Sequence, residues 1–180
     1  MPAQGGSPSG RKSDFPKGVI TPTDTSYPPI FKEVIKPALP VYFCGNVSLL
    51  QDSKKLAVIG SRHAADMHAR ALRRVLGDVH DLPLTIVSGL ALGLDALAHI
   101  IALENNLPTI AVLGSSVEKD EIYPRMNLGL AHRILMQDGL LISPFPEKTE
   151  PARWNFPIRN QFIAALSDAT LVASAATPFV

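Results

Sequence analysis

Cations and aromatic rings alternate in the stretch that begins at Arg153. Trp154, Phe156 and Arg159 continue the alternation, and Asn160 follows. Aromatic rings can stack on unpaired bases while arginines bind the phosphates between them. The alternative is that the two rings cover the end of a sheet and the arginines lie at the surface. Because Arg159 and Asn160 fall on one predicted helical turn, we favour nucleic-acid binding for this stretch.

A short loop, Gly60-Ser61-Arg62, follows an apolar run and precedes a predicted helix. Glycine lets the backbone approach a ligand, and a serine hydroxyl with free amides at a helix start favours an anion. An arginine adds a charge-assisted contact to a phosphate. A plain strand-to-helix turn with a solvent-facing arginine fits the pattern equally well.

A second loop of this kind starts at Ser88, contains Gly89 and Gly93, and ends at Asp95. It has neither the spacing of the dinucleotide-binding Gly-x-Gly-x-x-Gly fingerprint nor the Lys-Ser/Thr pair of a P-loop. The two glycines, four residues apart, allow a tight loop that opens a helix. For Asp95 the alternative is that it only favours the start of its own helix, by capping or through the dipole.

Asp95 and His99 are four residues apart, so they share one face of a predicted helix. Such a pair can act as a general base or orient a ligand, but a structural hydrogen bond between helix and loop is better supported. A metal site would need further ligands, and none occurs at a fixed spacing. A Gly-x-Ser-x-Gly elbow is absent, and the single cysteine, Cys44, precedes the predicted sheet. We therefore expect no catalytic residue, no metal and no cofactor.

Short apolar strands alternate with helices from residue 56 onward. This alternation predicts an α/β fold of three layers with a doubly wound, mainly parallel sheet. Ligands in such folds bind beyond the carboxyl ends of the strands, where the strand order reverses. The expected strands are Leu56–Ile59, Leu84–Ser88, Thr109–Leu113, Leu140–Ser143 and Ala169–Ala173, and the expected helices are Ala65–His80, Leu94–Asn105, Arg125–Gln137 and Pro157–Leu166.

The N-terminal part differs in composition from the rest. Eight of the sixteen prolines lie in the first forty residues. We expect a flexible Pro/Gly/Ser-rich tail over residues 1–26, and then one domain over 27–180 that opens with an irregular segment and one short helix at Phe31–Ile35.

The bulk composition is that of a soluble globular protein without a global charge. The net charge is +1, so any nucleic-acid surface must be a local patch. One cysteine indicates a reducing compartment, and no apolar run is long enough for a membrane span. We expect a cytoplasmic protein with no membrane association.

Several ordered motifs together resemble the DNA-processing protein A (DprA/Smf) family, over about residues 27–173. The resembling segments are Leu56–Arg62, Val87–Asp95 with Ala98-His99, Thr109–Gly114, Tyr123-Pro124 with Asn127, Phe156–Asn160, and Ala164–Asp168, with Tyr27-Pro28 and Gly45-Asn46 as the lead-in.

The resemblance implies a Rossmann-like fold that binds single-stranded DNA and assists loading of the recombinase RecA during natural transformation. It implies no established catalytic activity, and it leaves a homodimer open. The implied DNA contacts are Ser61, Arg62, Arg159 and Asn160, with the second glycine loop beside them.

The sequence departs from the family pattern at two places. Gln161 replaces the second arginine of the family's Arg-Asn-Arg, which removes one phosphate-binding charge, and Pro144 replaces a glutamate. The family also continues where this chain stops, so we expect the C-terminal part of its fold to be missing, in a fragment or a degenerate paralogue.

Two other functions are open from the sequence. One is nucleotide binding or hydrolysis, because related Rossmann-like folds include phosphoribohydrolases, although their Pro-Gly-Gly-x-Gly-Thr loop does not occur here. The other is a truncated protein that folds poorly and has no activity.

Overall fold

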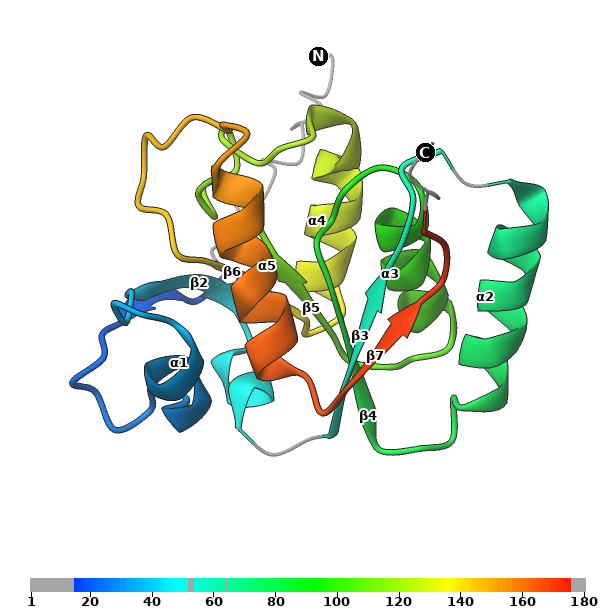
Figure 1. Cartoon of the computed structure of the whole chain (residues 1–180), viewed down its shortest axis with the longest axis horizontal. Helices are drawn as coiled ribbons and strands as arrows, with labels where there is room; N and C mark the ends of the chain where they lie inside the picture. The colour runs from blue at the N-terminus through cyan, green and yellow to red at the C-terminus, as the bar shows by residue number, and fades with distance from the viewer. Residues whose placement is uncertain (1–14, 52–53, 64, 176–180) are drawn as a thin grey trace, which may run out of the picture.

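The computed structural model describes residues 15–51, 54–63 and 65–175. Its centre is a seven-stranded sheet with the strand order β1-β2-β6-β5-β4-β3-β7 (Figure 1). The parallel strands are β3 (Lys54–Ile59), β4 (Leu84–Ser88), β5 (Thr109–Val112), β6 (Leu140–Ser143) and β7 (Ala169–Val172). All five predicted strands are therefore present, and the predicted fold class is confirmed.

Two antiparallel strands at one edge differ from the sequence-based expectation. β1 (Lys17–Ile20) pairs with β2 (Val41–Gly45), and β2 pairs with β6. β1 lies within the stretch expected to be a flexible tail, so the ordered part begins before residue 26. The pairing of β1 with β2 satisfies the hydrogen-bonding groups of the β1 backbone despite the prolines nearby. The amide of Gly45 adds a hydrogen bond to the carbonyl of Pro16, just before β1. Residues 1–14 of the expected tail lie outside the described residues.

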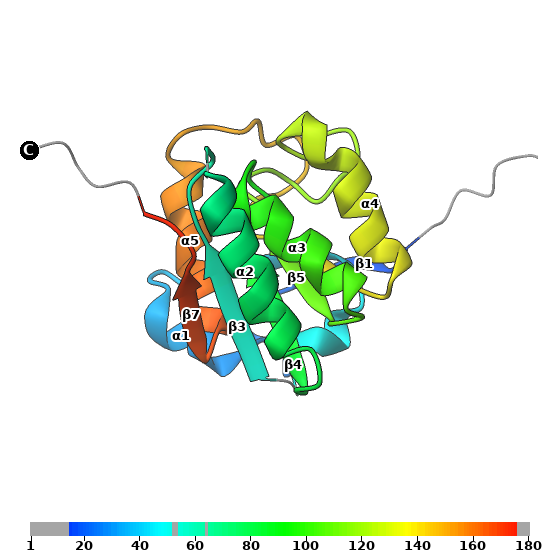
Figure 2. The same ribbon diagram turned by 90° about the vertical axis from the view of Figure 1, so that its right-hand side faces the viewer.

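The helices cover both faces of the sheet. Figure 2 shows α2 (Asp66–Asp78), α3 (Leu94–Glu104) and α4 (Leu128–Met136) side by side on one face, and α1 (Pro29–Val34) with α5 (Asn155–Leu166) on the other. Two short 3₁₀ turns, Val47–Leu50 and Arg125–Asn127, complete the elements. Within the described residues, no helix is both long and apolar enough to cross a membrane.

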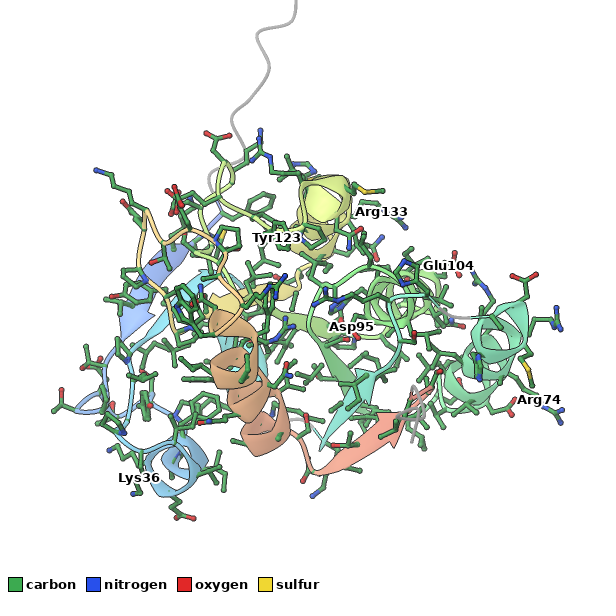
Figure 3. The ribbon with its side chains drawn as sticks, turned by 45° about the horizontal axis from the view of Figure 1, so that its top comes forward. Lys36, Arg74, Asp95, Glu104, Tyr123 and Arg133 are labelled. Carbon is green, nitrogen blue, oxygen red and sulfur yellow. The ribbon has the colours of Figure 1, made fainter. Side chains whose placement is uncertain are left out.

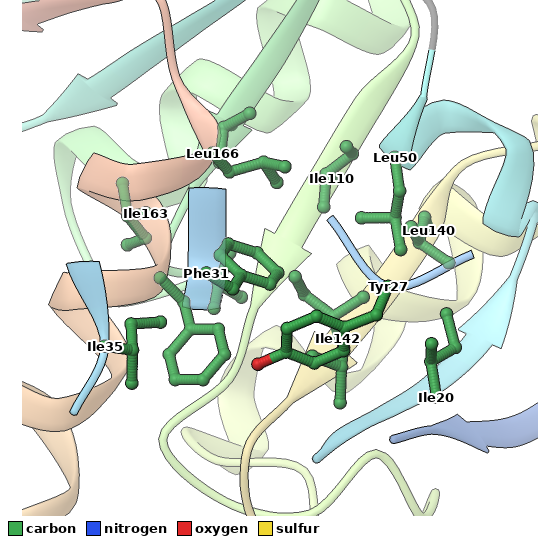
Figure 4. Close-up of a cluster of buried hydrophobic side chains, with 14 of the residues drawn as sticks. Ile20, Tyr27, Phe31, Ile35, Leu50, Ile110, Leu140, Ile142, Ile163 and Leu166 are labelled. Atoms are coloured by element: carbon green, nitrogen blue, oxygen red, sulfur yellow. The ribbon is translucent and has the colours of Figure 1, made fainter. Parts of the chain in front are cut away.

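The N-terminal segment packs onto α5 through aromatic side chains (Figure 4). Phe31 is fully buried, with its ring centroid 4.9 Å from that of Phe162 and 5.8 Å from that of Tyr27. The Tyr27 hydroxyl donates to the carbonyl of Leu39 at 2.8 Å, so the one polar atom of this aromatic group is satisfied. This packing fixes α5 against the sheet, and α5 carries the residues of the candidate site.

The strand order reverses at β3. The chain steps from β3 through β4 and β5 to β6 in one direction, and α5 then returns it to β7 on the other side of β3. The predicted position for a ligand is therefore the crevice beyond the carboxyl ends of β3 and β7, beside α5.

Candidate functional site

A cleft of about 500 Å³ occupies this crevice. Its walls come from the ends of β3 and β7, the loop after β3, the loop before α3, and α5. Six of the residues that the sequence singled out line it: Gly60, Arg62, Asp95, Phe156, Arg159 and Asn160. Predicted residues from three distant segments therefore meet where the topology predicts a ligand.

The loop after β3 is locked to the loop before α3 by a close backbone approach. Gly93 has a φ of +80°, and a Cβ atom there would lie 2.5 Å from the carbonyl oxygen of Ser61 and 2.6 Å from that of Arg62. The amide of Leu94 donates to the same Ser61 carbonyl at 3.2 Å. Only glycine fits this position, which explains the need for it in the sequence pattern.

The carboxylate of Asp95 interacts with backbone amides from both glycine loops. Its carboxylate accepts hydrogen bonds from the backbone N–H groups of Gly60, Gly89 and Ala91. The residue is 6% exposed, and Figure 3 shows it near the middle of the molecule. Burial raises the pKa of Asp95, while the nearby Arg159 and the three amides act in the opposite direction. The carboxylate thus ties the strand ends together at the inner wall of the cleft.

Arg159 is a buried clamp rather than a free surface cation. It is 5% exposed, and its Nη1 donates to the carbonyls of Gly89 and, at 2.6 Å, of Val112. Its Nε donates to the side chain of Asn160 at 2.9 Å. Burial lowers the pKa of Arg159 to about 10, against the opposing effect of Asp95. Arg159 therefore joins the ends of β4 and β5 to α5, and it also lines the cleft.

The ring of Phe156 lies close to both arginines of the cleft. The guanidinium carbon of Arg62 is 5.6 Å from the ring centroid and that of Arg159 is 5.8 Å away, within cation–π range. Tyr123 approaches the same ring with a centroid distance of 6.1 Å. Arg62 itself is exposed at the mouth of the cleft. The Phe156 ring therefore contacts both the buried Arg159 and the exposed Arg62.

The remaining predicted residues differ in how far their side chains are exposed to solvent. Trp154 is 73% exposed at the start of α5, and Ser61 is half-buried with its hydroxyl bonded to the backbone of His63. Ser88 and Gly89 are buried, and the Ser88 hydroxyl donates to the Val58 carbonyl at 2.6 Å. Ser88 and Gly89 thus support the site from below, whereas Ala91 and Asp95 of the same loop line the cleft.

His99 lies behind the cleft and does not pair with Asp95. It is fully buried, and its Nδ1 is 2.7 Å from the hydroxyl of Thr109, which bonds the Ile86 carbonyl at 3.0 Å. Its Nε2 is buried without a hydrogen-bond partner in the described structure. Burial, with a further contribution from Arg159, lowers the pKa of His99 to about 3. The proximity in sequence to Asp95 therefore does not create a general base.

The depressed pKa of His99 predicts acid sensitivity of the fold. The unfolded chain takes up a proton near the ordinary histidine pKa of about 6.5, whereas the folded protein resists protonation until about pH 3. Stability is therefore fully present above pH ~6.5 and is lost as the pH falls through this window. Between about pH 7 and about pH 5 the free energy of unfolding should fall by about 2 kcal/mol from this residue alone.

Urea unfolding at these two pH values checks the prediction. In His99→Asn, which removes the titrating group but keeps an amide N–H donor, the difference between the two pH values should shrink by about 2 kcal/mol. The exposed His63, changed to glutamine, serves as the control and should leave the difference unchanged. An unaltered pH dependence in His99→Asn would show that His99 is protonated equally in both states.

Three polar residues support the site but were not predicted as site residues, although Asn127 and Thr109 belong to segments that resemble the family. Asn155 is buried on α5 and its amide donates to the carbonyls of Gly114 and Glu150; Asn127 donates to those of Leu90 and Ala91. Thr109 holds His99. A signal for Asn155 existed, because it falls on the same helical stripe as the apolar residues that α5 buries. In the described residues, no group of three or more His, Cys, Asp or Glu side chains is arranged to hold a metal ion.

Comparison with known proteins decides the family. A family model described as DNA recombination-mediator protein A matches residues 18–178. The chain belongs to this family. It is 38% identical over 159 residues to protein Smf of Synechocystis sp., which covers 87% of this chain and 39% of that protein. It is 36% identical over 152 residues to the DNA processing protein DprA of Streptococcus pneumoniae, which covers 84% of this chain and 52% of that protein.

Solved structures of the family share the fold. The X-ray structure of DNA processing protein A from Streptococcus pneumoniae superposes with a TM-score of 0.78 at 34% identity, covering 89% of this chain and 54% of that one. A structure of DNA processing protein A from Helicobacter pylori, which concerns its single-stranded DNA binding mode, gives a TM-score of 0.74 at 28% identity, covering 88% of this chain and 69% of that one. The chain spans about half or less of the length of the two curated relatives named above.

Proposed function

We propose that this chain binds single-stranded DNA in the cleft between α5 and the loop after β3, and that it catalyses no reaction. The observation that carries the proposal is the exposed Arg62 at the mouth of a cleft whose floor is a second, buried arginine. The family membership and the Helicobacter pylori structure, which concerns single-stranded DNA binding, support the same ligand.

Each residue of the site has a distinct role in the proposal. Arg62 holds a backbone phosphate, with Ser61 and the backbone of Gly60 beside it. Arg159 and Asn160 present the polar atoms of the cleft floor. Trp154 and the accessible part of Phe156 contact bases by stacking, which tolerates any sequence. Ser88, Gly89 and Gly93 act indirectly, because they hold the loops that carry these groups.

The geometry of the titratable groups supports binding over chemistry. The carboxylate of Asp95 is engaged with three amides, and His99 is directed at Thr109 behind the cleft. Neither group has the exposed, mutually bonded arrangement that a base and a nucleophile require. Both serve instead to position the loops.

The wider role that we propose is protection of incoming DNA in natural transformation, in the cytoplasm, with RecA loaded onto the bound strand. The description of the family as recombination mediators supports RecA as the partner. A homodimer would place two such clefts on one strand. These statements concern the activity of whole relatives, of which this chain spans about half or less.

Replacing Arg62 with alanine should weaken binding to labelled oligothymidine by about tenfold. It should also make the plot of log Kobs against log salt concentration shallower by about 0.7, the contribution of one phosphate contact on a single strand. Fluorescence anisotropy at two or more salt concentrations measures both quantities. Trp154, the only tryptophan of the chain, gives a label-free signal for base stacking.

The control variant is Arg74→Ala, because Arg74 is exposed on α2 and points away from the cleft (Figure 3). It should leave affinity and salt dependence unchanged. If wild-type protein does not bind oligothymidine more tightly than duplex DNA of the same length, the proposed function is wrong. If it binds but Arg62→Ala binds equally well, the phosphate contact lies elsewhere.

A further inference from the structure

The inner wall of the cleft already contains an anion that belongs to the chain. In doubly wound folds, the backbone amides that follow the strands commonly bind the phosphate of a nucleotide. Here the amides of Gly60, Gly89 and Ala91 are directed at the carboxylate of Asp95. A Cβ atom on Gly89 would lie 2.6 Å from Oδ2 of Asp95, so the carboxylate is packed closely against this loop. The donors that a phosphate would use are thus occupied.

The ionisable side chains that line the cleft have a net charge of +1, which one bound negative charge would balance. Its lining contains two guanidiniums, of Arg62 and Arg159, and one carboxylate, of Asp95. Arg159 and Asp95 are both buried and each affects the pKa of the other in the direction expected for opposite charges. They offset one another, so Arg62 remains as the uncompensated cation, and it lies at the mouth.

We propose that Asp95 makes the cleft selective for the phosphodiester of a continuous strand and against the phosphomonoester of a free nucleotide or a strand end. A phosphodiester carries one negative charge, which Arg62 can balance. A phosphomonoester carries a charge of about −1.5 to −2 at neutral pH, and its additional charge would face the fixed carboxylate. The inference rests on the proposed function and specifies which part of a DNA strand the site accepts.

Folds of this type commonly bind free nucleotides. The proposed selectivity explains how this chain would bind a DNA strand even where free nucleotides are abundant. Asp95 excludes them by two effects, since it fills the amide donors and repels a second negative charge. A neutral side chain in its place would remove the repulsion, and a shorter one would also release the amides.

Wild-type protein tests the selectivity directly. Calorimetry with dTMP should show no binding at concentrations where oligothymidine binds fully, and millimolar dTMP should not displace labelled oligothymidine. Addition of a 5′-phosphate to a hexathymidylate should change its affinity by less than about twofold. Tight binding of dTMP, or a gain of about tenfold from the 5′-phosphate, would overturn the inference.

Two variants test the role of the carboxylate. Asp95→Asn removes the charge at nearly constant shape, and Asp95→Ser also frees the amide donors. Each should gain affinity for dTMP by about tenfold or more, and for inorganic phosphate in the same direction. Glu33→Gln makes the same change of net charge on α1, outside the cleft, and should show no gain.

The outcomes separate this inference from the proposed function. A folded Asp95→Asn, judged by a cooperative thermal transition, that gains no affinity for dTMP overturns the role of Asp95. If both Asp95 variants fail to fold, the comparison of dTMP with oligothymidine on wild-type protein decides. If wild-type protein does not bind oligothymidine, the proposed function is contradicted. A gain of dTMP binding in Asp95→Asn then still supports the exclusion of phosphomonoesters by Asp95, but not a preference for strands.

Discussion

Replacing Arg159 with methionine is expected to lower the free energy of unfolding by about 3–5 kcal/mol. The substitution keeps a long side chain but leaves the buried carbonyls of Gly89 and Val112 without their donor. It also leaves the buried carboxylate of Asp95 without its nearest opposite charge. Both penalties fall on groups that water reaches poorly, which is why the effect should exceed that of an ordinary surface arginine.

Equilibrium unfolding in urea measures this loss. Arg159→Lys should show an intermediate loss, because an ammonium retains the charge but cannot span two carbonyls and Asn160 as the planar guanidinium does. Arg153→Met is the matched control, since Arg153 is exposed just before α5, and it should change stability by less than about 0.5 kcal/mol. An Arg159→Met protein as stable as the Arg153→Met protein would contradict the clamp.

The clamp affects how DNA-binding experiments on Arg159 are interpreted. Removal of Arg159 changes the shape of the cleft, because its hydrogen bonds to Gly89 and Val112 are lost, and it also removes a polar group from the cleft lining. Reduced binding in Arg159→Ala therefore does not by itself demonstrate contact with DNA. Arg62 is the better probe of contact, because its side chain is exposed and supports no buried backbone group in the described structure.

The parallel half of the sheet could be predicted from the sequence, whereas its antiparallel edge could not. Strands such as β5 and β6 are buried along their whole length, so they appear as apolar runs that end at glycine or a turn. β1 and β2 lie among prolines, and their stability depends on the pairing of β2 with β6, almost one hundred residues away. Contacts of that range leave no periodic pattern in a local segment.

Six residues that line the cleft could be named from the sequence, but their burial could not. Arg159 and Arg62 are both arginines in loop or helix-start motifs, yet one is a buried clamp and the other an exposed cation. The difference arises because α5 crosses the ends of β4 and β5, which only the tertiary structure determines. A partial signal is present, since Arg159 shares a helical stripe with Phe162 and Ile163, and a cation on an apolar stripe requires buried partners.

Replacing Gly93 with alanine is expected to lower the free energy of unfolding by about 2–4 kcal/mol. The backbone at φ +80° strains any residue with a side chain, and the new methyl group would lie 2.5 Å from the Ser61 carbonyl and 2.6 Å from that of Arg62. Because these contacts are with backbone atoms, no side-chain rotation can relieve them. Urea unfolding measures the loss, and Gly77→Ala on α2, where a Cβ meets nothing within 4 Å, should instead stabilise by about 0.5 kcal/mol.

The same substitution connects the fold to the proposed binding site. Relief of the contact requires the loop Gly60-Ser61-Arg62 to move away from α3, and this displaces the exposed cation at the mouth of the cleft. Where Gly93→Ala remains folded, its affinity for oligothymidine should therefore fall by about as much as that of Arg62→Ala, about tenfold. A folded Gly93→Ala with wild-type affinity would show that the position of this loop does not determine strand binding.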